Sequence, residues 1–489
     1  MKITAIIATA SLATSTLATP KDLPSQTNKE IVVISDAAKI VTPSHLWLGM
    51  GFNWSAYEGF CNPNHYFGDE AVELTEEQWS TVFRRVDFMR LKFIRLMSYS
   101  SGYLRGRDAQ GEPIYVFREK QPNLYLRNVY RILDWAQAHD VHVFMGDWQM
   151  GTLNTGVQKG HPFAVRVEAD FIEHLVREKG YSCIKNWCSG NEEGVSKNPA
   201  ILEGWLALKK ELVKRKLDVG LGGPDHYVPG EQVKDLEFIL DHHPDLLSIY
   251  ENHYYGKVPD TTERELIDRK APDGINKPWF AGEAAHPRAW NNTHEEAVTT
   301  IASYVRHLHA RSSGVLHWLL DSSEYREHRP HGIWKITTGE VYPRFYPLAL
   351  FTRLFWAPGR DGKNGGAIIH CEPNNGPVLA TAITRPNGNR YDLSYVLVNP
   401  DPKEERRVIL KEQQAISKAT LTVYRFEKQG AALDADGLPV PAQHIKDADL
   451  AAGVPIHLPP SSVVFVTTDD GGTPVAINLV KTQLKSIYQ

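Results

Sequence analysis

The chain has 489 residues, which is too long for one small domain and fits a barrel of roughly 250 residues with a second domain of roughly 100. Its hydrophobic content of 42% and charged content of 23% are ordinary for a globular protein. The formal net charge of −4 provides no basic surface, so nucleic acid is not an expected partner.

The N-terminal segment has the composition of a secretory signal. An uncharged run rich in Ala, Ile, Leu and Thr follows Lys2 and extends to about Ala18. It is too weakly apolar for a membrane anchor, which needs about 20 strongly apolar residues. We therefore expect residues 1–19 to be a signal peptide, a secreted or periplasmic location and no membrane span; the alternative is a disordered tail. Export would permit disulfides, but buried thiols fit equally well for the four cysteines, Cys61, Cys183, Cys188 and Cys371.

Eight short apolar runs alternate with amphipathic segments in the next part of the chain. Continuous apolar runs are typical of parallel strands buried on both faces. The expected strands are residues 46–53, 93–97, 141–147, 183–190, 219–224, 246–255, 279–283 and 315–321. The expected helices are residues 75–90, 124–139, 164–179, 200–216, 231–243, 262–269, 295–311 and 346–355. This alternation predicts an α/β fold, a (β/α)8 TIM barrel over residues 46–358. A doubly wound sheet is disfavoured because no Gly-x-Gly-x-x-Gly follows the first strand.

The pattern changes after about residue 358. Glycines at positions 359, 362, 365 and 366 indicate a linker, and no long helical period follows. Strand-like runs lie at residues 378–383, 392–398, 407–410, 420–426 and 463–468, and turn residues separate them. These runs predict an all-β sandwich over residues 359–470. We expect the strand-like segment in residues 31–45 to join this sandwich, and residues 471–489 to form a tail without assigned structure.

Polar and aromatic side chains stand at the ends of the predicted barrel strands, where the chemistry of such barrels collects. A single strand end of this kind is explained better by a loop residue that faces water. A polar residue at nearly every strand end favours a functional rim. The rim residues include Asn53, Arg95, Asp147, Trp148, Asn191, Glu192, Asp225, His226, His253, Tyr255, Glu283, Trp318 and Asp321.

Two of these residues are carboxylates at the ends of strands four and seven, Glu192 and Glu283. Glycosidic cleavage needs an acid that protonates the leaving oxygen and a carboxylate that attacks the anomeric carbon or activates water. The apolar strand before Glu192 and the adjacent acid Glu193 favour a protonated carboxyl, as the acid requires. Glu283 would stay ionised beside Arg95 and the Tyr255 hydroxyl, as a nucleophile requires. The alternatives are a helix N-terminal acid for Glu192 and an exposed loop acid for Glu283.

The segment Trp187…Gly190-Asn191-Glu192 resembles the strand-four Asn-Glu signature of the clan A glycoside hydrolases, which are retaining (β/α)8 glycosidases. Glu193 departs from the signature because Pro commonly stands there. The clan's strand-seven segment is similar to Lys277-Pro278-Trp279-Phe280-Ala281-Gly282-Glu283, and its strand-six segment is similar to His253-Tyr254-Tyr255. Phe93-Ile94-Arg95 resembles the strand-two segment, and Trp318 resembles the strand-eight tryptophan. The resemblance covers about residues 45–356.

The resemblance implies that Glu192 is the acid/base and Glu283 the nucleophile of a retaining glycoside hydrolase acting on β-linked sugars. It implies that Asn191 binds the sugar 2-hydroxyl and that Arg95 and Tyr255 hold Glu283. It also implies that His253 lines the site and that Trp318 forms the floor of the subsite that holds the cleaved sugar. From their places on the rim we expect further sugar contacts from Asp147, Trp148, Asp225 and His226.

Two alternatives stay open, a non-catalytic carbohydrate-binding barrel and an unrelated TIM-barrel hydrolase or lyase. A metal-dependent amidohydrolase is disfavoured, since no His-x-His closes the first strand and no Lys ends the fourth. We expect a carbohydrate substrate, with no metal and no cofactor. The sugar, its linkage, endo or exo action and the oligomeric state are left open by the sequence.

Overall fold

The structure, a computed structural model, describes residues 30–54, 73–256, 259–285, 291–322, 331–335, 338–359, 365–387, 390–414 and 418–469. The predicted signal peptide, Cys61 and the predicted tail lie outside these residues. Among the described cysteines, Cys183, Cys188 and Cys371 are free thiols, and all three are buried.

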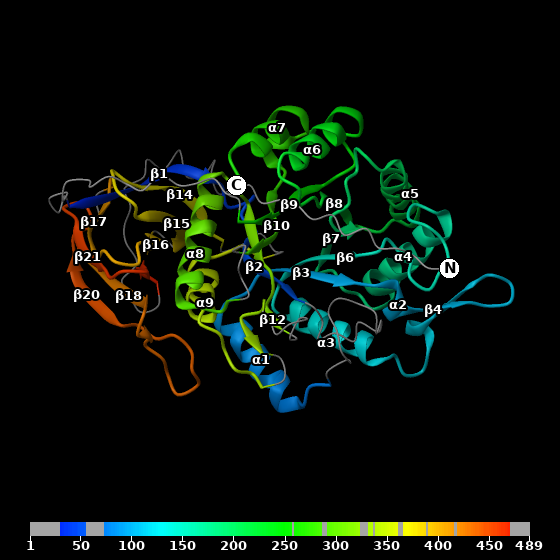
Figure 1. The fold of residues 1–489 in the computed structure, drawn as a ribbon, viewed down its shortest axis with the longest axis horizontal. Coiled ribbons are helices and arrows are strands. Elements are labelled where there is room, and N and C mark those ends of the chain that lie inside the picture. Colours follow the sequence, from blue (N-terminus) through cyan, green and yellow to red (C-terminus); the bar gives the residue numbers. More distant parts are fainter. Residues whose placement is uncertain are drawn as a thin grey trace, which may run out of the picture. The chain divides into compact units, whose positions relative to one another are not determined.

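Eight parallel strands close into a barrel in the order β10-β11-β2-β3-β6-β7-β8-β9 (Figure 1). Their bounds are β2 Gly49–Trp54, β3 Phe93–Ser98, β6 His142–Asp147, β7 Ile184–Ser189, β8 Gly220–Pro224, β9 Ile249–Tyr255, β10 Trp279–Ala285 and β11 Gly314–His317. The predicted barrel is confirmed, although several strands are shorter than expected. β11 ends at His317, and Asp321 instead begins β12 (Asp321–Ser322), which pairs with β13 (Trp334–Lys335).

Helices follow the barrel strands as the amphipathic pattern predicts. They are α1 Glu76–Phe88, α3 Leu124–Ala138, α4 Pro162–Glu173, α5 Pro199–Arg215, α6 Glu231–His242, α7 Thr262–Lys270, α8 His294–His309 and α9 Phe345–Leu354. Side-chain caps begin several of them; Thr75 and Gln78, for example, form a reciprocal capping box at α1. No helix of the described residues is long and apolar enough to cross a bilayer.

The long segment after β3 contains structure that the sequence pattern did not predict. The short helix α2 (Ser100–Tyr103) leads into a hairpin of β4 (Leu104–Arg107) and β5 (Pro113–Tyr115). A 3₁₀ turn, Val116–Arg118, then precedes α3, and two more irregular turns occur later, the π-helical His174–Glu178 after α4 and the 3₁₀ turn Gly274–Asn276. Elements of three to five residues carry too little periodicity to be read from a sequence.

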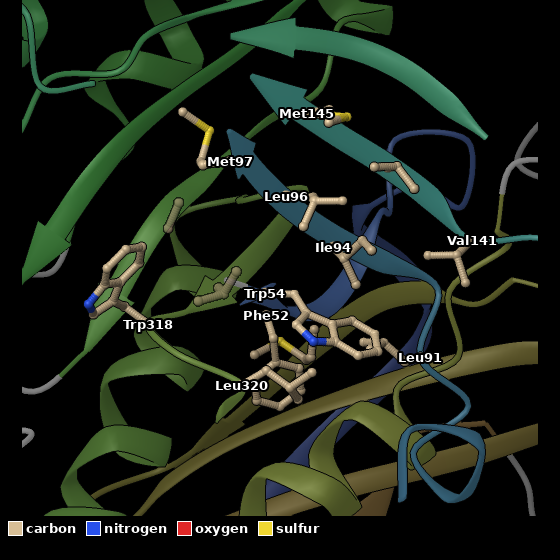
Figure 2. Close-up of a cluster of buried hydrophobic side chains, with 14 of the residues drawn as sticks. Phe52, Trp54, Leu91, Ile94, Leu96, Met97, Val141, Met145, Trp318 and Leu320 are labelled. Atoms are coloured by element: carbon tan, nitrogen blue, oxygen red, sulfur yellow. The ribbon is translucent and has the colours of Figure 1, made fainter. Parts of the chain in front are cut away.

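The two faces of the barrel strands have different partners. Phe52, Trp54, Ile94, Leu96 and Met145 belong to the large apolar cluster that also includes helix residues (Figure 2). A separate small cluster fills the barrel interior with Phe93, Phe144, Cys188, Ile249, Phe280 and Leu316. Because alternate residues of a strand face the same side, the next inward positions above this apolar floor are polar ones such as Arg95 and Glu251.

The second domain is a sheet of ten strands in the order β19-β18-β22-β16-β15-β14-β1-β17-β21, with β20 paired to β18. The strands are β1 Ile31–Thr42, β14 Ala367–Pro373, β15 Leu379–Asn387, β16 Arg390–Asn399, β17 Arg406–Glu412, β18 Ala419–Glu427, β19 Gly430–Ala431, β20 Gln443–Ala448, β21 Val454–Leu458 and β22 Ser462–Thr467. β21, at one end of the order, contacts β16 and β22, so the sheet folds back around its own apolar core as a sandwich. β1 enters this sheet between β14 and β17.

Barrel and sandwich meet through α8 and α9, which contact β15, β16 and β22. At this junction the Asp469 carboxylate accepts hydrogen bonds from Arg90 Nη1 at 2.7 Å and from Trp356 Nε1 at 2.8 Å. Its side chain is 18% exposed, whereas Asp436, which pairs with Arg84, is 54% exposed. The shielded Asp469 therefore links the two domains more strongly than the exposed pair does.

Replacing Asp469 with Ala is expected to lower the free energy of unfolding by about 1–3 kcal/mol, because the buried Trp356 and the partly exposed Arg90 lose their acceptor. The matched variant Asp436→Ala removes an exposed ion pair and is expected to cost less than about 1 kcal/mol. Urea unfolding of both variants by tryptophan fluorescence measures the difference. Equal losses in the two variants would show that Asp469 links the domains no more strongly than the exposed pair does.

Candidate active site

Glu283, the predicted strand-seven carboxylate, lies in β10 next to an irregularity in the strand pairing. The pairing of β10 with β9 shifts register between Ala281 and Glu283. Phe280 lies in the interior floor, and a Cβ added to Gly282 would fall 2.0 Å from Glu251 Oε2, so Gly282 also faces the barrel interior. The register shift allows Glu283 to face inward directly after Gly282, which simple alternation would forbid.

Glu192 stands in the loop after β7 with a left-handed backbone, φ 58°. Its backbone N–H donates to Asp225 Oδ2 at 3.1 Å, which holds the loop in place. The next helix, α5, begins only at Pro199, so Glu192 is not a first-turn helix acid. Its side chain is 32% exposed, which leaves the carboxyl accessible from the rim.

Both predicted carboxylates converge on His253 of β9. His253 Nδ1 lies 3.0 Å from Glu192 Oε1 and 3.4 Å from Glu283 Oε2. One oxygen of each carboxylate and the ring nitrogen all lie within 4.8 Å of one another. Glu283 is only 4% exposed, which rules out an exposed loop acid.

Arg95 of β3 is 0% exposed and joins four strand ends through its guanidinium. Nη1 donates to Asn53 Oδ1 at 3.1 Å and to Glu283 Oε1. Nη2 donates to Asn191 Oδ1 at 3.0 Å and to Asp225 Oδ1 at 3.1 Å. The predicted contact of Arg95 with Glu283 is present, and the same cation also fixes the Asn-Glu segment.

The second predicted partner of Glu283 is also in place, since the Tyr255 hydroxyl donates to Glu283 Oε2 at 2.5 Å. Burial is the largest influence on this carboxyl and raises its pKa above the ordinary value. The charges of His253 and Arg95 and the Tyr255 hydrogen bond oppose that rise. The expectation from sequence counted only Arg95 and Tyr255 and missed the desolvation of a carboxylate held inside the barrel.

Asp225 has a different place from the sugar ligand that the sequence suggested. It is buried, and its Oδ1 lies 2.6 Å from His253 Nε2. Burial opposes its ionisation, but His253 and Arg95 outweigh that effect and hold its pKa below the ordinary value. Burial likewise disfavours the charged form of His253, yet Glu283 and Asp225 raise the pKa of His253 well above its usual range. Asp225 is thus the counter-ion of the site.

Asp147 was expected on the sugar, but the structure buries it completely. Its carboxylate accepts hydrogen bonds from the Tyr103 hydroxyl at 2.7 Å and from the Gln149 N–H at 2.8 Å, and burial raises its pKa to about 6. One oxygen therefore anchors the loop after β6, and the other joins Asp147 to α2. Tyr103 belongs to α2, which was not predicted, and this is why the sequence did not reveal that Asp147 is buried away from the sugar.

The two rim tryptophans pack together. The rings of Trp148 and Trp318 stack with centroids 5.6 Å apart and an interplanar angle of 26°. Trp318 follows β11 and lies apart from the side chains around Trp54 (Figure 2). Tyr255, by contrast, is exposed at the rim. The site thus combines aromatic faces with a charged cluster, a combination suited to sugars.

Glu193 does not supply the uncompensated negative charge that the sequence suggested. Lys159, from the loop after β6, forms an ion pair with its carboxylate. That lysine comes from a distant part of the chain, so the adjacent-residue pattern could not reveal it.

Two groups of side chains are close enough to hold a cation, Glu192 with His253 and Glu283, and Cys188 with Asp225 and Glu251. Arg95 and His253 already bring positive charge to both groups. A divalent ion would have to overcome that repulsion, so the donor set fits an acid–base site better than a metal centre.

The charged cluster is completed by three residues whose roles in it were not predicted from the sequence, Asn53, Asp225 and Glu251. Asn53 Nδ2 donates to the carbonyl of Gly282 at 3.0 Å. Glu251 precedes His253 by two positions in β9, and this period of two was the available signal that both face inward.

The charge of His253 can be measured directly. We expect its ring to titrate above the ordinary value of about 6.5, and Asp225→Asn to lower that pKa because an anion stabilising the imidazolium is removed. Histidine NMR with a His253→Gln variant for assignment gives the titration. His142, whose pKa burial lowers to about 4, serves as the internal control. A His253 that titrates near His142 would contradict the charge network.

No protein-family model and no curated protein matches the sequence. Solved structures do match the fold. The glycoside hydrolase family 30 subfamily 8 xylanase from Clostridium acetobutylicum has 13% identity and a TM-score of 0.61, covering 89% of this chain and 99% of that chain. A monomeric β-xylosidase from Caulobacter crescentus CB15 has 12% identity and a TM-score of 0.58 over 89% and 99%. A glucosidase from Croceicoccus marinus has 11% identity and a TM-score of 0.61 over 90% and 99%. The chain therefore has the fold of these glycoside hydrolases over nearly its whole described length.

Proposed function

We propose that the protein is a retaining glycoside hydrolase that cleaves β-linked oligo- or polysaccharides through a covalent glycosyl-enzyme. The observation that carries this proposal is the oxygen separation of Glu192 and Glu283, within 4.8 Å. Retaining pairs have carboxyl groups about 5–5.5 Å apart, whereas inverting pairs leave about 6.5–9.5 Å for a water molecule. The fold shared with a xylanase, a β-xylosidase and a glucosidase supports the same class.

The first step forms a bond between a Glu283 oxygen and the anomeric carbon. As the bond to the leaving oxygen breaks, Glu192 transfers its proton to that oxygen. Glu283 suits the nucleophile because Arg95 and Tyr255 fix both of its oxygens. Glu192 suits the acid because its carboxyl is the more accessible one.

In the second step Glu192 takes a proton from water, whose oxygen attacks the anomeric carbon and releases Glu283 as a carboxylate. Asn191 accepts from Arg95 through Oδ1, so its NH₂ group is the end suited to donate to the sugar 2-hydroxyl. The stacked rings of Trp148 and Trp318, 8% and 7% exposed, stand at the ends of β6 and β11, where the sugar ring would bind. A non-catalytic sugar-binding barrel would not need this pair of carboxylates in unequal environments.

Hydrolysis of aryl β-glycosides and β-linked oligosaccharides tests the proposal. NMR of the first product should show the β-anomer before mutarotation, and Glu283→Gln should abolish turnover while circular dichroism and the melting temperature stay close to wild type. An α-anomer formed first would disprove retention. Turnover by the Glu283→Gln variant would remove Glu283 from the nucleophile role.

Tyr255→Phe should shift the acidic limb of the kcat/KM profile to higher pH. The Tyr255 hydroxyl stabilises ionised Glu283, so its loss raises the carboxyl pKa and keeps the nucleophile protonated to higher pH. The adjacent Tyr254 faces outward and donates to Glu263 of α7, so Tyr254→Phe is the matched control and should leave the profile unchanged. An acidic limb that stays in place, or moves to lower pH, in Tyr255→Phe would contradict this assignment.

A further inference from the structure

Glu251 is a fully buried acid, 0% exposed, that the proposed mechanism does not use. It lies on the inward face of β9 between the apolar floor residue Ile249 and His253. One of its oxygens, an Asp225 oxygen and Cys188 Sγ lie within 4.8 Å of one another. Its Oε2 stands 3.8 Å from His253 Nε2 and is the atom that a Cβ on Gly282 would meet. Glu251 thus lies beside groups from β7, the end of β8 and β10, the part of the barrel that carries Glu192 and Glu283.

Its partner Asp225 holds three parts of the site at once. Asp225 Oδ1 engages Arg95 and His253, and Oδ2 accepts the backbone N–H of Glu192. A rotation of this carboxylate would displace the cations that face Glu283 and the loop that carries Glu192. Whatever fixes Asp225 therefore positions both catalytic groups.

One carboxyl oxygen of Glu251 and one of Asp225 lie within 4.8 Å of each other, and both side chains are buried. Two ionised carboxylates at this distance would repel each other and neither could donate a hydrogen bond, so a proton on one of them relieves the repulsion and supplies a donor. Asp225 has two cations beside it and is the ionised partner. Burial, and then the charge of Asp225, raise the pKa of Glu251 well above the ordinary value.

The charge balance of the buried layer agrees with this assignment. Arg95 and His253 are positive, and Asp225 and Glu283 are negative, so a neutral Glu251 leaves the layer balanced. An ionised Glu251 would add an unpaired negative charge that is shielded from water, which is strongly unfavourable. The thiol of Cys188 is neutral for the same reason, since burial raises its pKa as well.

We propose that Glu251 is a positioning residue, a neutral carboxylic acid that donates a hydrogen bond to Asp225 and thereby fixes Arg95, His253 and the Glu192 loop. This inference rests on the proposed hydrolase function. It explains the glycine before the nucleophile, because any side chain at Gly282 would displace the Glu251 carboxyl. Glu251 acts through Asp225 and does not touch the substrate.

The first test detects the proton on Glu251 directly and does not require the protein to hydrolyse a substrate. The infrared difference spectrum between wild type and Glu251→Gln at pH 7 should show the carbonyl stretch of a protonated carboxylic acid, lost in the variant. A difference spectrum that shows only a lost carboxylate would overturn the inference, whether or not the protein hydrolyses glycosides.

The second test is kinetic. Glu251→Gln keeps a neutral donor and should retain kcat/KM within about tenfold. Glu251→Leu removes the donor and should lower kcat about a hundredfold with little change in KM, because the catalytic groups are displaced while the sugar surfaces stay. Glu412→Gln alters a buried acid of β17 in the sandwich and should leave kcat unchanged.

Gly282→Ala gives an independent check, since it moves the Glu251 carboxyl without removing it. Gly282→Ala alone should reduce kcat as Glu251→Leu does, and in a Glu251→Ala background it should cause little further loss. Equal kinetics of Glu251→Gln and Glu251→Leu would overturn the positioning role alone. Absence of turnover in the wild type would refute the proposed function. The infrared spectrum would still show whether Glu251 carries a proton.

Discussion

The buried guanidinium of Arg95 is the constraint on which the active site depends. A charge removed from water is tolerated only when nearby groups neutralise it and accept its hydrogen bonds. Asn53, Asn191, Asp225 and Glu283 meet that demand, and each comes from a different strand end. Satisfying one cation therefore brings four segments of the barrel rim to fixed positions, and the catalytic pair follows from that arrangement.

The same constraint makes the two proposed catalytic carboxylates unequal. Glu283 is enclosed between Arg95, His253 and Tyr255, so its oxygens are fixed and its charge is compensated. Glu192 is held mainly through its backbone by Asp225, and its carboxyl remains at the rim. One group is thereby suited to attack and the other to exchange protons with a leaving group and with water. An apolar floor below, formed by residues such as Phe93 and Phe280, closes the interior to water.

Much of the fold could be predicted because its signals are local. Continuous apolar runs identified the eight barrel strands, and caps such as Thr75 identified helix starts. Four strands of the sandwich were missed, β14, β19, β20 and β21. Of these, β20 gave no apolar signal because Gln443–Ala448 is mostly exposed and polar. The predicted catalytic pair does converge in the structure. Long-range contacts decided the rest: Tyr103 buries Asp147, Lys159 neutralises Glu193, and a register shift in β10 allows Gly282 and Glu283 to face the same side.

The most direct test of the account is to trap the covalent intermediate. A 2-deoxy-2-fluoro β-glycoside with a good leaving group slows release of the enzyme-bound sugar, and peptide mass spectrometry then locates the attached mass. The account predicts one sugar residue per chain, attached to Glu283, with the site protected when substrate is in excess. A label on Glu192, or hydrolysis of the reagent without any covalent label, would contradict the assignment of Glu283 as the nucleophile.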